Sequence, residues 1–309
     1  MNKRDIFPTT ADPESTHELA GDEQGRRKFI KHMLGGSLML VTLPTLASTL
    51  FKKGASEAEF QRVKQEYLEK YCPPGYDPFA HQWAYGIDAY KCIGCNQCMT
   101  ACKIENGLPG HPSINNRWIE RYTRIKGDPH VYVDATTDPG NIAVSDPDNF
   151  IYRFDDRYAE ADVEYSFFVP KMCNHCEDPV CTQVCPKGAT FKTPDGAVLV
   201  DEDRCIGCLY CKQACPYGAR YLRPIPARPD GVTRVAGKCT WCWHRLTKGL
   251  EPACVGVCPK KALIFGDLND PDSDISLWIK KHGRELLVLK ADMGTHPSVK
   301  YIGINEEVR

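Results

Sequence analysis

Sixteen of the 17 cysteines in this chain fall into four groups of four, with spacings that metal-binding thiolates use. The pattern is clearest between Cys205 and Pro216, where the residues read C-x2-C-x2-C-x3-C-P. That spacing holds an iron–sulfur cubane, because three thiolates of one tight loop reach three corners of the cluster. The fourth cysteine of such a loop usually binds a second cluster. Gly207 suits the loop, since glycine accepts a positive φ and lets the backbone approach the sulfur atoms.

The other three groups repeat or vary this loop. In chain order, the groups are Cys92, Cys95, Cys98 and Cys102 (one); Cys173, Cys176, Cys181 and Cys185 (two); Cys205, Cys208, Cys211 and Cys215 (three); and Cys239, Cys242, Cys254 and Cys258 (four). A proline follows the last cysteine of groups two, three and four. No group contains C-x-x-C-H, which excludes attachment of a c-type haem. The seventeenth cysteine, Cys72, stands alone and is assigned no role.

Short strand-like segments flank the cysteine groups and indicate how the groups pair. Residues 197–201 precede group three, and residues 85–88 precede group one in a similar way. Strand-like segments also follow group two at 189–191 and group four at 262–265. Groups two and three therefore predict one compact module, and groups four and one predict the same module in permuted order.

The predicted fold is α+β, with two nested bacterial-ferredoxin-like modules, an insertion and a short irregular C-terminal extension. The inner module covers 171–235, and the permuted outer module covers 81–130 and 236–309. Because the outer module encloses the inner one in sequence, neither is expected to fold alone. The insertion, residues 131–170, has no metal-binding spacing and is expected either to cover the clusters or to form a docking surface.

Local patterns outside the cysteine groups predict a few further elements. A capping box from Ser56 to Glu59 begins an amphipathic helix over 56–71. Alternating residues over 118–125 and 130–133 predict strands. Near the C terminus, the apolar runs at 275–279 and 286–289 are too short to span a membrane.

The N-terminal region predicts a targeting signal ahead of the folded part. Residues 1–25 are polar and acidic, which is typical of a disordered tail. Residues 26–53 begin with Arg26–Arg27 and continue into a moderately apolar run, the pattern of a twin-arginine export signal. A transmembrane helix is the weaker interpretation, because glycine, serine, threonine and proline interrupt the run, but an uncleaved anchor stays open. A helix and linker over 54–80 follow.

Composition and motifs exclude several functions. The formal net charge is −1, so the chain lacks the basic footprint of a protein that binds nucleic acid. The sequence contains neither G-x-G-x-x-G nor G-x-x-x-x-G-K-[ST], and it contains no other metal constellation. We therefore expect a non-catalytic electron carrier rather than a self-sufficient enzyme.

With all four groups in view, the chain resembles the four-cluster iron–sulfur subunits of the dimethyl-sulfoxide and polysulfide reductase family. The resemblance covers about residues 82–302 and is carried by the segments Lys238–Arg245, Gly249–Cys254, Val257–Pro259, Gly266–Pro271 and Gly294–Pro297. It implies electron transfer between a molybdopterin-type catalytic subunit, or a multihaem cytochrome, and an integral-membrane quinone-reacting subunit. Together with the export signal, it implies a periplasmic protein held at the membrane by these partners.

The resemblance also implies which cysteines share a cluster. The implied sets are Cys92, Cys95, Cys98 and Cys258; Cys102, Cys239, Cys242 and Cys254; Cys173, Cys176, Cys181 and Cys215; and Cys185, Cys205, Cys208 and Cys211. Some relatives have another residue at the position of Cys208 and carry a three-iron cluster there. Since this chain has cysteine, four [4Fe–4S] clusters are expected.

A structural zinc-binding protein is the main alternative, because C-x2-C pairs alone also suit zinc. The three C-P endings and the two C-I-G-C loops argue against zinc. His175 and His244 stand beside predicted ligands, and a packing or potential-tuning role is expected for both, because each cluster already has four cysteines. Trp241 and Trp243 are likewise expected to pack around a cluster.

Overall fold

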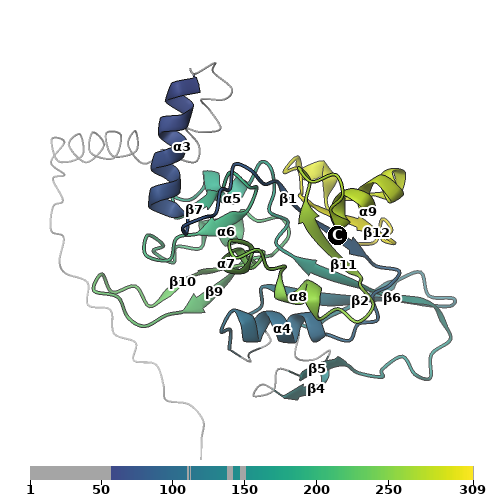
Figure 1. Cartoon of the computed structure of the whole chain (residues 1–309). Helices are drawn as coiled ribbons and strands as arrows, with labels where there is room; N and C mark the ends of the chain where they lie inside the picture. Colours follow the sequence, from purple (N-terminus) through teal and green to yellow (C-terminus); the bar gives the residue numbers. More distant parts are fainter. Residues whose placement is uncertain (1–56, 110, 112, 138–141, 147–150, 309) are drawn as a thin grey trace, which may run out of the picture. The chain divides into compact units, whose positions relative to one another are not determined.

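The computed structural model describes residues 57–308, apart from 110, 112, 138–141 and 147–150. The described residues all belong to one compact unit, residues 43–309 (Figure 1). The tail predicted over 1–25 and the export signal predicted over 26–53 lie outside the described residues. Among the helices of the described part, none is both long enough and apolar enough to cross a membrane.

Helix α3 (Glu57–Tyr71) matches the amphipathic helix predicted at the start of the described chain. Its apolar face buries Val63 and Tyr67. Phe79, in the linker that follows, packs edge-on against the ring of Tyr67, with ring centroids 5.6 Å apart. The helix is therefore held by its own linker through aromatic contacts.

The outer module is built on strand β1 (Trp83–Asp88), the central strand of a three-stranded sheet. β11 (Leu263–Asp267) pairs with it antiparallel, and β12 (Val299–Ile302) pairs with it in parallel. Helices α4 (Gln97–Glu105) and α8 (Ala253–Gly256) pack against each other beside this sheet (Figure 1). Segments about 170 residues apart thus form one unit, as the permuted pairing of groups one and four predicts.

The inner module repeats this arrangement in simple chain order. Strands β7 (Thr190–Lys192) and β8 (Val198–Val200) form a hairpin, and helices α5 (Val180–Gln183) and α6 (Tyr210–Gln213) pack together.

An equivalent backbone hydrogen bond in each module shows that the two modules correspond. The N–H of Asp201 donates to the carbonyl of Ala189 at 2.7 Å, and that of Asp88 donates to the carbonyl of Ala262 at 2.8 Å. Each aspartate lies four residues before the first cysteine of a C-I-G-C loop. The two modules therefore share the strand register that positions these loops.

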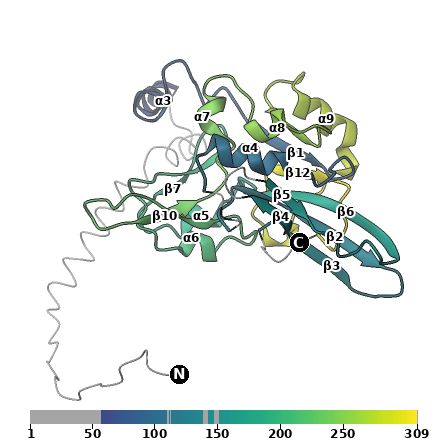
Figure 2. The same ribbon diagram turned by 90° about the horizontal axis from the view of Figure 1, so that it is seen from below.

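The chain between Cys102 and Cys173 forms a second three-stranded sheet. Its order is β3 (Val131–Ala135), β2 (Arg117–Ile125) and β6 (Val163–Met172), which Figure 2 shows side by side. β6 ends directly before Cys173, so the sheet runs into the first ligand loop of group two. A separate pair, β4 (Ile142–Asp146) and β5 (Ile151–Phe154), completes this region.

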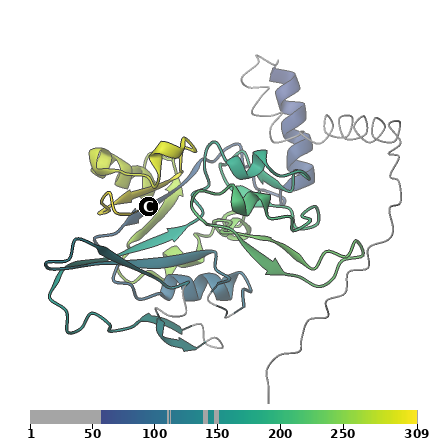
Figure 3. The same ribbon diagram turned by 180° about the vertical axis from the view of Figure 1, so that it is seen from behind.

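A hairpin leads from group three into group four. Its strands are β9 (Tyr221–Pro224) and β10 (Arg234–Gly237), visible from behind in green in Figure 3. β10 ends two residues before Cys239, and the short helix α7 (Trp243–Leu246) follows Cys242. Regular structure therefore lies close to both sides of this cysteine pair.

The C-terminal extension is more regular than expected. It contains helix α9 (Asp274–His282), the 3-10 turns η2 (Gly283–Glu285) and η3 (Ala291–Met293), and strand β12. Ser273 caps α9 by accepting a hydrogen bond from the N–H of Ser276. Periodicity did not resolve this element, because a five-residue run with four apolar residues suits a helix and a strand equally.

Candidate metal centres

Cysteines from different groups come together at four places, which we call sites 1 to 4. Site 1 contains Cys92, Cys95, Cys98 and Cys258; site 2 contains Cys102, Cys239, Cys242 and Cys254; site 3 contains Cys173, Cys176, Cys181 and Cys215; site 4 contains Cys185, Cys205, Cys208 and Cys211. At sites 1, 2 and 4 the four side chains line one cavity. At site 3 the other three thiols all act electrostatically on Cys176. The structure thus brings together the same sets that the family resemblance implies.

The two C-I-G-C loops are shaped by backbone with positive φ. Gly94 has φ 66° and Gly207 has φ 68°, and each loop then enters its helix through a left-handed residue, Asn96 or Leu209. A Cβ added at Gly207 would lie 2.5 Å from the carbonyl oxygen of Arg234, closer than real side chains come. Glycine is therefore required there both for its φ and for its close approach to a neighbouring backbone.

Sites 1 and 4 reach the surface, whereas sites 2 and 3 meet inside the molecule. Cys95 and Cys208 are exposed. The loops of sites 2 and 3 instead carry Trp241 and His175, which are buried and stack with ring centroids 4.0 Å apart. This stack joins the C-x-x-C loop of group four to that of group two.

His175 has both ring nitrogens engaged within the protein. The N–H of Val198 donates to Nδ1 at 2.9 Å, so Nε2 carries the proton and donates to the carbonyl of Cys239 at 3.0 Å. Burial, reinforced by the neighbouring Lys238, lowers the pKa of His175 well below its usual value. The imidazole is neutral and has no free nitrogen for a metal, which agrees with its expected packing role.

The other two side chains singled out beside group four are also engaged. His244 is exposed and its Nε2 lies 2.8 Å from Glu105. The indole N–H of Trp243 donates to the buried carboxylate of Asp195 at 3.0 Å. Both residues fix loops near site 2, and neither lines its cavity.

The thiols are buried where their ionisation is costly. Burial is the largest cause that raises the pKa of Cys92 to about 11 and those of Cys98 and Cys239 to about 12. Neighbouring thiols raise these values further. Four such groups become thiolates together only when a positively charged core replaces their protons, and this is what metal binding does.

Several buried donors near the cysteines also fit an iron–sulfur centre. Arg117 lines site 2, and its Nε and one Nη have no acceptor within the described protein; the same holds for the indole N–H of Trp241. Cluster sulfides would accept these hydrogen bonds. Across the described residues, no three cysteine, histidine or carboxylate side chains converge as a single ion requires, and at sites 1, 2 and 4 the cysteines line a cavity instead.

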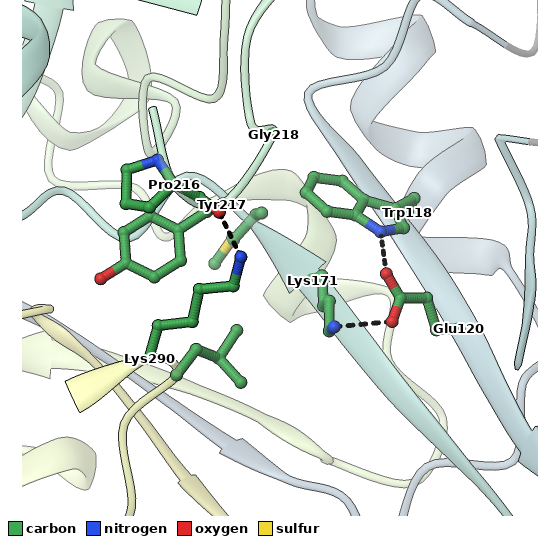
Figure 4. Close-up of a pocket in the computed structure, with 9 residues that line it drawn as sticks. Trp118, Glu120, Lys171, Pro216, Tyr217, Gly218 and Lys290 are labelled. Atoms are coloured by element: carbon green, nitrogen blue, oxygen red, sulfur yellow. Dashed lines mark hydrogen bonds and ion pairs between the residues drawn. The ribbon is translucent and has the colours of Figure 1, made fainter. Parts of the chain in front are cut away.

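A cavity of about 260 Å³ lies beside site 3 and is shown in Figure 4. Glu120 forms an ion pair with Lys171 at 2.6 Å and accepts a hydrogen bond from Trp118 at 2.8 Å. On the opposite wall, Lys290 donates to the carbonyl of Pro216, the residue after Cys215. The second sheet and the C-terminal segment therefore both line the cavity beside the Cys215 loop. For the insertion over 131–170, cover for the clusters and a docking surface both stay predictions.

Three of the buried cations in the described part of the chain lie near the cysteine sites and were not anticipated from the sequence. Arg117 is 1% exposed, Arg220 2% and Lys238 3%. A charged residue in a strand such as β2 usually indicates a solvent-facing position, so no local pattern identified Arg117. Only the packing of distant segments makes these side chains neighbours of the thiols.

Comparison with known proteins agrees with this geometry. Two family models, both described as a 4Fe–4S dicluster domain, match residues 91–189 and 164–268. The chain is 36% identical to one subunit of the tetrathionate reductase of Salmonella typhimurium over 229 residues, which cover 73% of this chain and 74% of that protein. It is 34% identical to the iron–sulfur subunit of the arsenate respiratory reductase of a Shewanella species, over 70% of this chain and 94% of that protein. A putative dimethyl sulfoxide reductase iron–sulfur subunit of Halobacterium salinarum is 37% identical over 70% of this chain and 77% of its own length.

Proposed function

The chain belongs to the 4Fe–4S dicluster family of iron–sulfur subunits of multi-subunit reductases, and from this premise we propose that it relays electrons through four [4Fe–4S] clusters. The observation that carries the proposal is the gathering of 16 cysteines from four sequence groups into four sets of four. Each bound cluster would accept and release one electron at a time. The protein supplies the thiolates, the buried surroundings and the spacing.

The exposure of the sites supports a linear relay in the order 1, 2, 3, 4. Sites 1 and 2 share helix α4, which contributes Cys98 to one and Cys102 to the other. Sites 3 and 4 are linked by Cys211, in α6, and Cys215, just after that helix, and the His175–Trp241 stack links sites 2 and 3. The surface loops at sites 1 and 4 are the places for electrons to enter and leave.

Partners at the two ends complete the proposal. One is an integral-membrane quinone-reacting subunit, and the other is a molybdopterin-type catalytic subunit or a multihaem cytochrome. Ile93 is 50% exposed beside site 1 and Ile206 is 42% exposed beside site 4, so each loop offers apolar surface to a partner. The chain itself carries electrons and catalyses no substrate chemistry in this proposal.

We place the protein in the periplasm, at the membrane through its partners or through an uncleaved signal anchor. The Arg26–Arg27 signal supports this location. The cysteines are compatible with this location, because thiolate clusters assembled before export escape disulfide formation in an oxidising compartment.

The test is to purify the protein anaerobically from native membranes with whatever accompanies it. The proposal expects about 16 iron atoms and as many sulfides per chain, four cubane signals by EPR after reduction, and a membrane subunit and a pterin or haem subunit in the same complex. Reduction of the clusters by a quinol, or their oxidation by a quinone, would show the relay at work. Stoichiometric zinc with no acid-labile sulfide would instead establish the structural zinc alternative.

A further inference from the structure

Each junction between neighbouring cluster sites contains one buried cation. Arg117 lies between sites 1 and 2, Lys238 between sites 2 and 3, and Arg220 between sites 3 and 4. In the described part of the chain, none of the three forms an ion pair with a carboxylate. Burying a cation without a counter-ion is costly, so the regular placement of three of them calls for a reason.

Arg117 extends from β2 into the wall of site 2. It donates from Nη1 to the hydroxyl of Tyr85 at 3.3 Å, and that hydroxyl lies 3.3 Å from the sulfur of Cys254. Arg117 itself lines site 2, and Ile119, two residues further along β2, lines site 1. The charge of Arg117 is therefore held where the walls of the two sites adjoin.

Arg220 has the corresponding place in the inner module. It donates from Nη2 to the sulfur of Cys181 at 3.0 Å and from Nη1 to Thr190 at 3.2 Å. Cys181 belongs to site 3, whereas Thr190 lines the cavity of site 4. Arg220 therefore also contacts the walls of two sites.

Lys238 occupies the boundary between the modules. Its ammonium donates to the carbonyls of Cys239 and Val198 and lies 3.5 Å from Nε2 of His175. It thus contacts group four, which contributes to site 2, and the His175 loop of site 3.

We propose that Arg117, Lys238 and Arg220 are positioning residues that hold one positive charge at each junction, and so raise the reduction potentials of the two clusters that adjoin it. The proposal rests on the proposed function, since it needs clusters at the four sites. Four thiolates make each cluster an anion, and reduction adds a further negative charge. A nearby cation in a weakly polar interior stabilises the reduced state more than the oxidised state.

The cations also matter for neighbouring clusters that are reduced together. Two adjacent reduced clusters repel each other, and this repulsion opposes the movement of successive electrons along the relay. A positive charge between them offsets part of the repulsion. Placing the cation at the junction, rather than at one cluster, lets one side chain serve both.

The test is an EPR-monitored redox titration of the anaerobically purified protein carrying Arg117→Met, Lys238→Met or Arg220→Met, one at a time. We expect lower potentials at sites 1 and 2 in the first variant, at 2 and 3 in the second, and at 3 and 4 in the third. Each affected midpoint potential should fall by at least about 59 mV. For a one-electron couple, this lowers the ratio of reduced to oxidised cluster at the wild-type midpoint potential tenfold. The two clusters away from the substitution are the internal control.

Arg117→Lys and Arg220→Lys keep the charge and should restore most of the lost potential. Unchanged potentials with all clusters present, or equal shifts at all four, would overturn the inference and leave the proposed function intact. Absence of cubanes from the wild type would overturn the proposed function itself. If a methionine variant loses a cluster, retention by the lysine variant supports a requirement for charge, and loss in both assigns the residue a structural role and refutes the inference.

Discussion

The side chains of Cys98 and Cys102 illustrate how this protein divides its ligands. They lie four residues apart on α4, so both project from one face of the helix, about one turn apart. Cys98 nevertheless lines site 1 and Cys102 lines site 2. One helical turn therefore spans the junction between two sites, and these two cysteines belong to different sets although they are neighbours in sequence.

This division predicts the effect of Cys102→Ser. The variant should lose or alter the cluster at site 2 and leave site 1 intact, because Cys102 shares its cavity with group four. Cys208→Ser is the matched comparison and should affect only site 4, giving a three-iron centre or an empty site. Site-resolved EPR titration measures both variants. Loss confined to the Cys92–Cys98 cluster in Cys102→Ser would mean that each sequence group binds its own cubane.

The buried thiols also predict how cluster loss depends on pH. A thiol whose pKa burial raises to about 11 or 12 takes a proton as soon as iron leaves, whereas iron keeps it ionised. Stability supplied by the clusters is therefore present at high pH and falls as the solution becomes more acidic. Chelation of iron under anaerobic conditions should proceed faster at about pH 6 than at about pH 8. A rate that does not change, or one that increases with pH, would contradict this account.

At the scale of elements, the C-I-G-C loops depend on a few backbone positions. Gly207 combines a left-handed φ with contact against the backbone of β10. Gly218, after Cys215, has a similar φ of 62°, but nothing lies within 4 Å of the position of its missing Cβ. A comparison of substitutions at the two glycines therefore distinguishes the effect of backbone strain from that of a steric clash.

We expect Gly207→Ala to reduce the iron content of site 4 and to lower the melting temperature clearly more than Gly218→Ala does. Both variants carry the left-handed strain of a non-glycine residue, about 1–2 kcal/mol. Only Gly207→Ala must also displace the carbonyl of Arg234. Iron analysis and thermal melts of the two variants give the comparison, and equal effects would show that φ alone makes glycine necessary.

At the scale of the molecule, the core is organised around the cysteines. The main hydrophobic core contains thiols of sites 1, 2 and 3 together with aliphatic and aromatic side chains such as Ile87, Met172 and Trp241. A second, smaller hydrophobic core contains Cys181, Cys205 and Cys211 of the inner module. Assembly of the proposed iron–sulfur clusters and folding would therefore involve the same interior, which supports the proposal that assembly precedes export.

We predict that replacing Arg26 and Arg27 together by lysine retains cluster-loaded protein in the cytoplasm. A twin-arginine signal is read as an address, and in the proposed signal Arg26 and Arg27 are the paired arginines that define it. Cell fractionation with iron analysis of each fraction provides the measurement, and a single Arg26→Lys variant is the milder control. Full export of the double variant with its iron would leave residues 26–53 better interpreted as a membrane anchor.

The sequence by itself determined the ligand chemistry, the α+β class and the pairing of the two modules. This was possible because a cluster loop is a local structure: the spacing from Cys205 to Cys215 and the strand before it depend on neighbours in the chain. The tertiary structure alone decided the helical C-terminal extension, the His175–Trp241 stack and the burial of Arg117, Lys238 and Arg220. These features arise from contacts between segments far apart in the chain, such as Cys181 with Arg220, and no local spacing encodes such contacts.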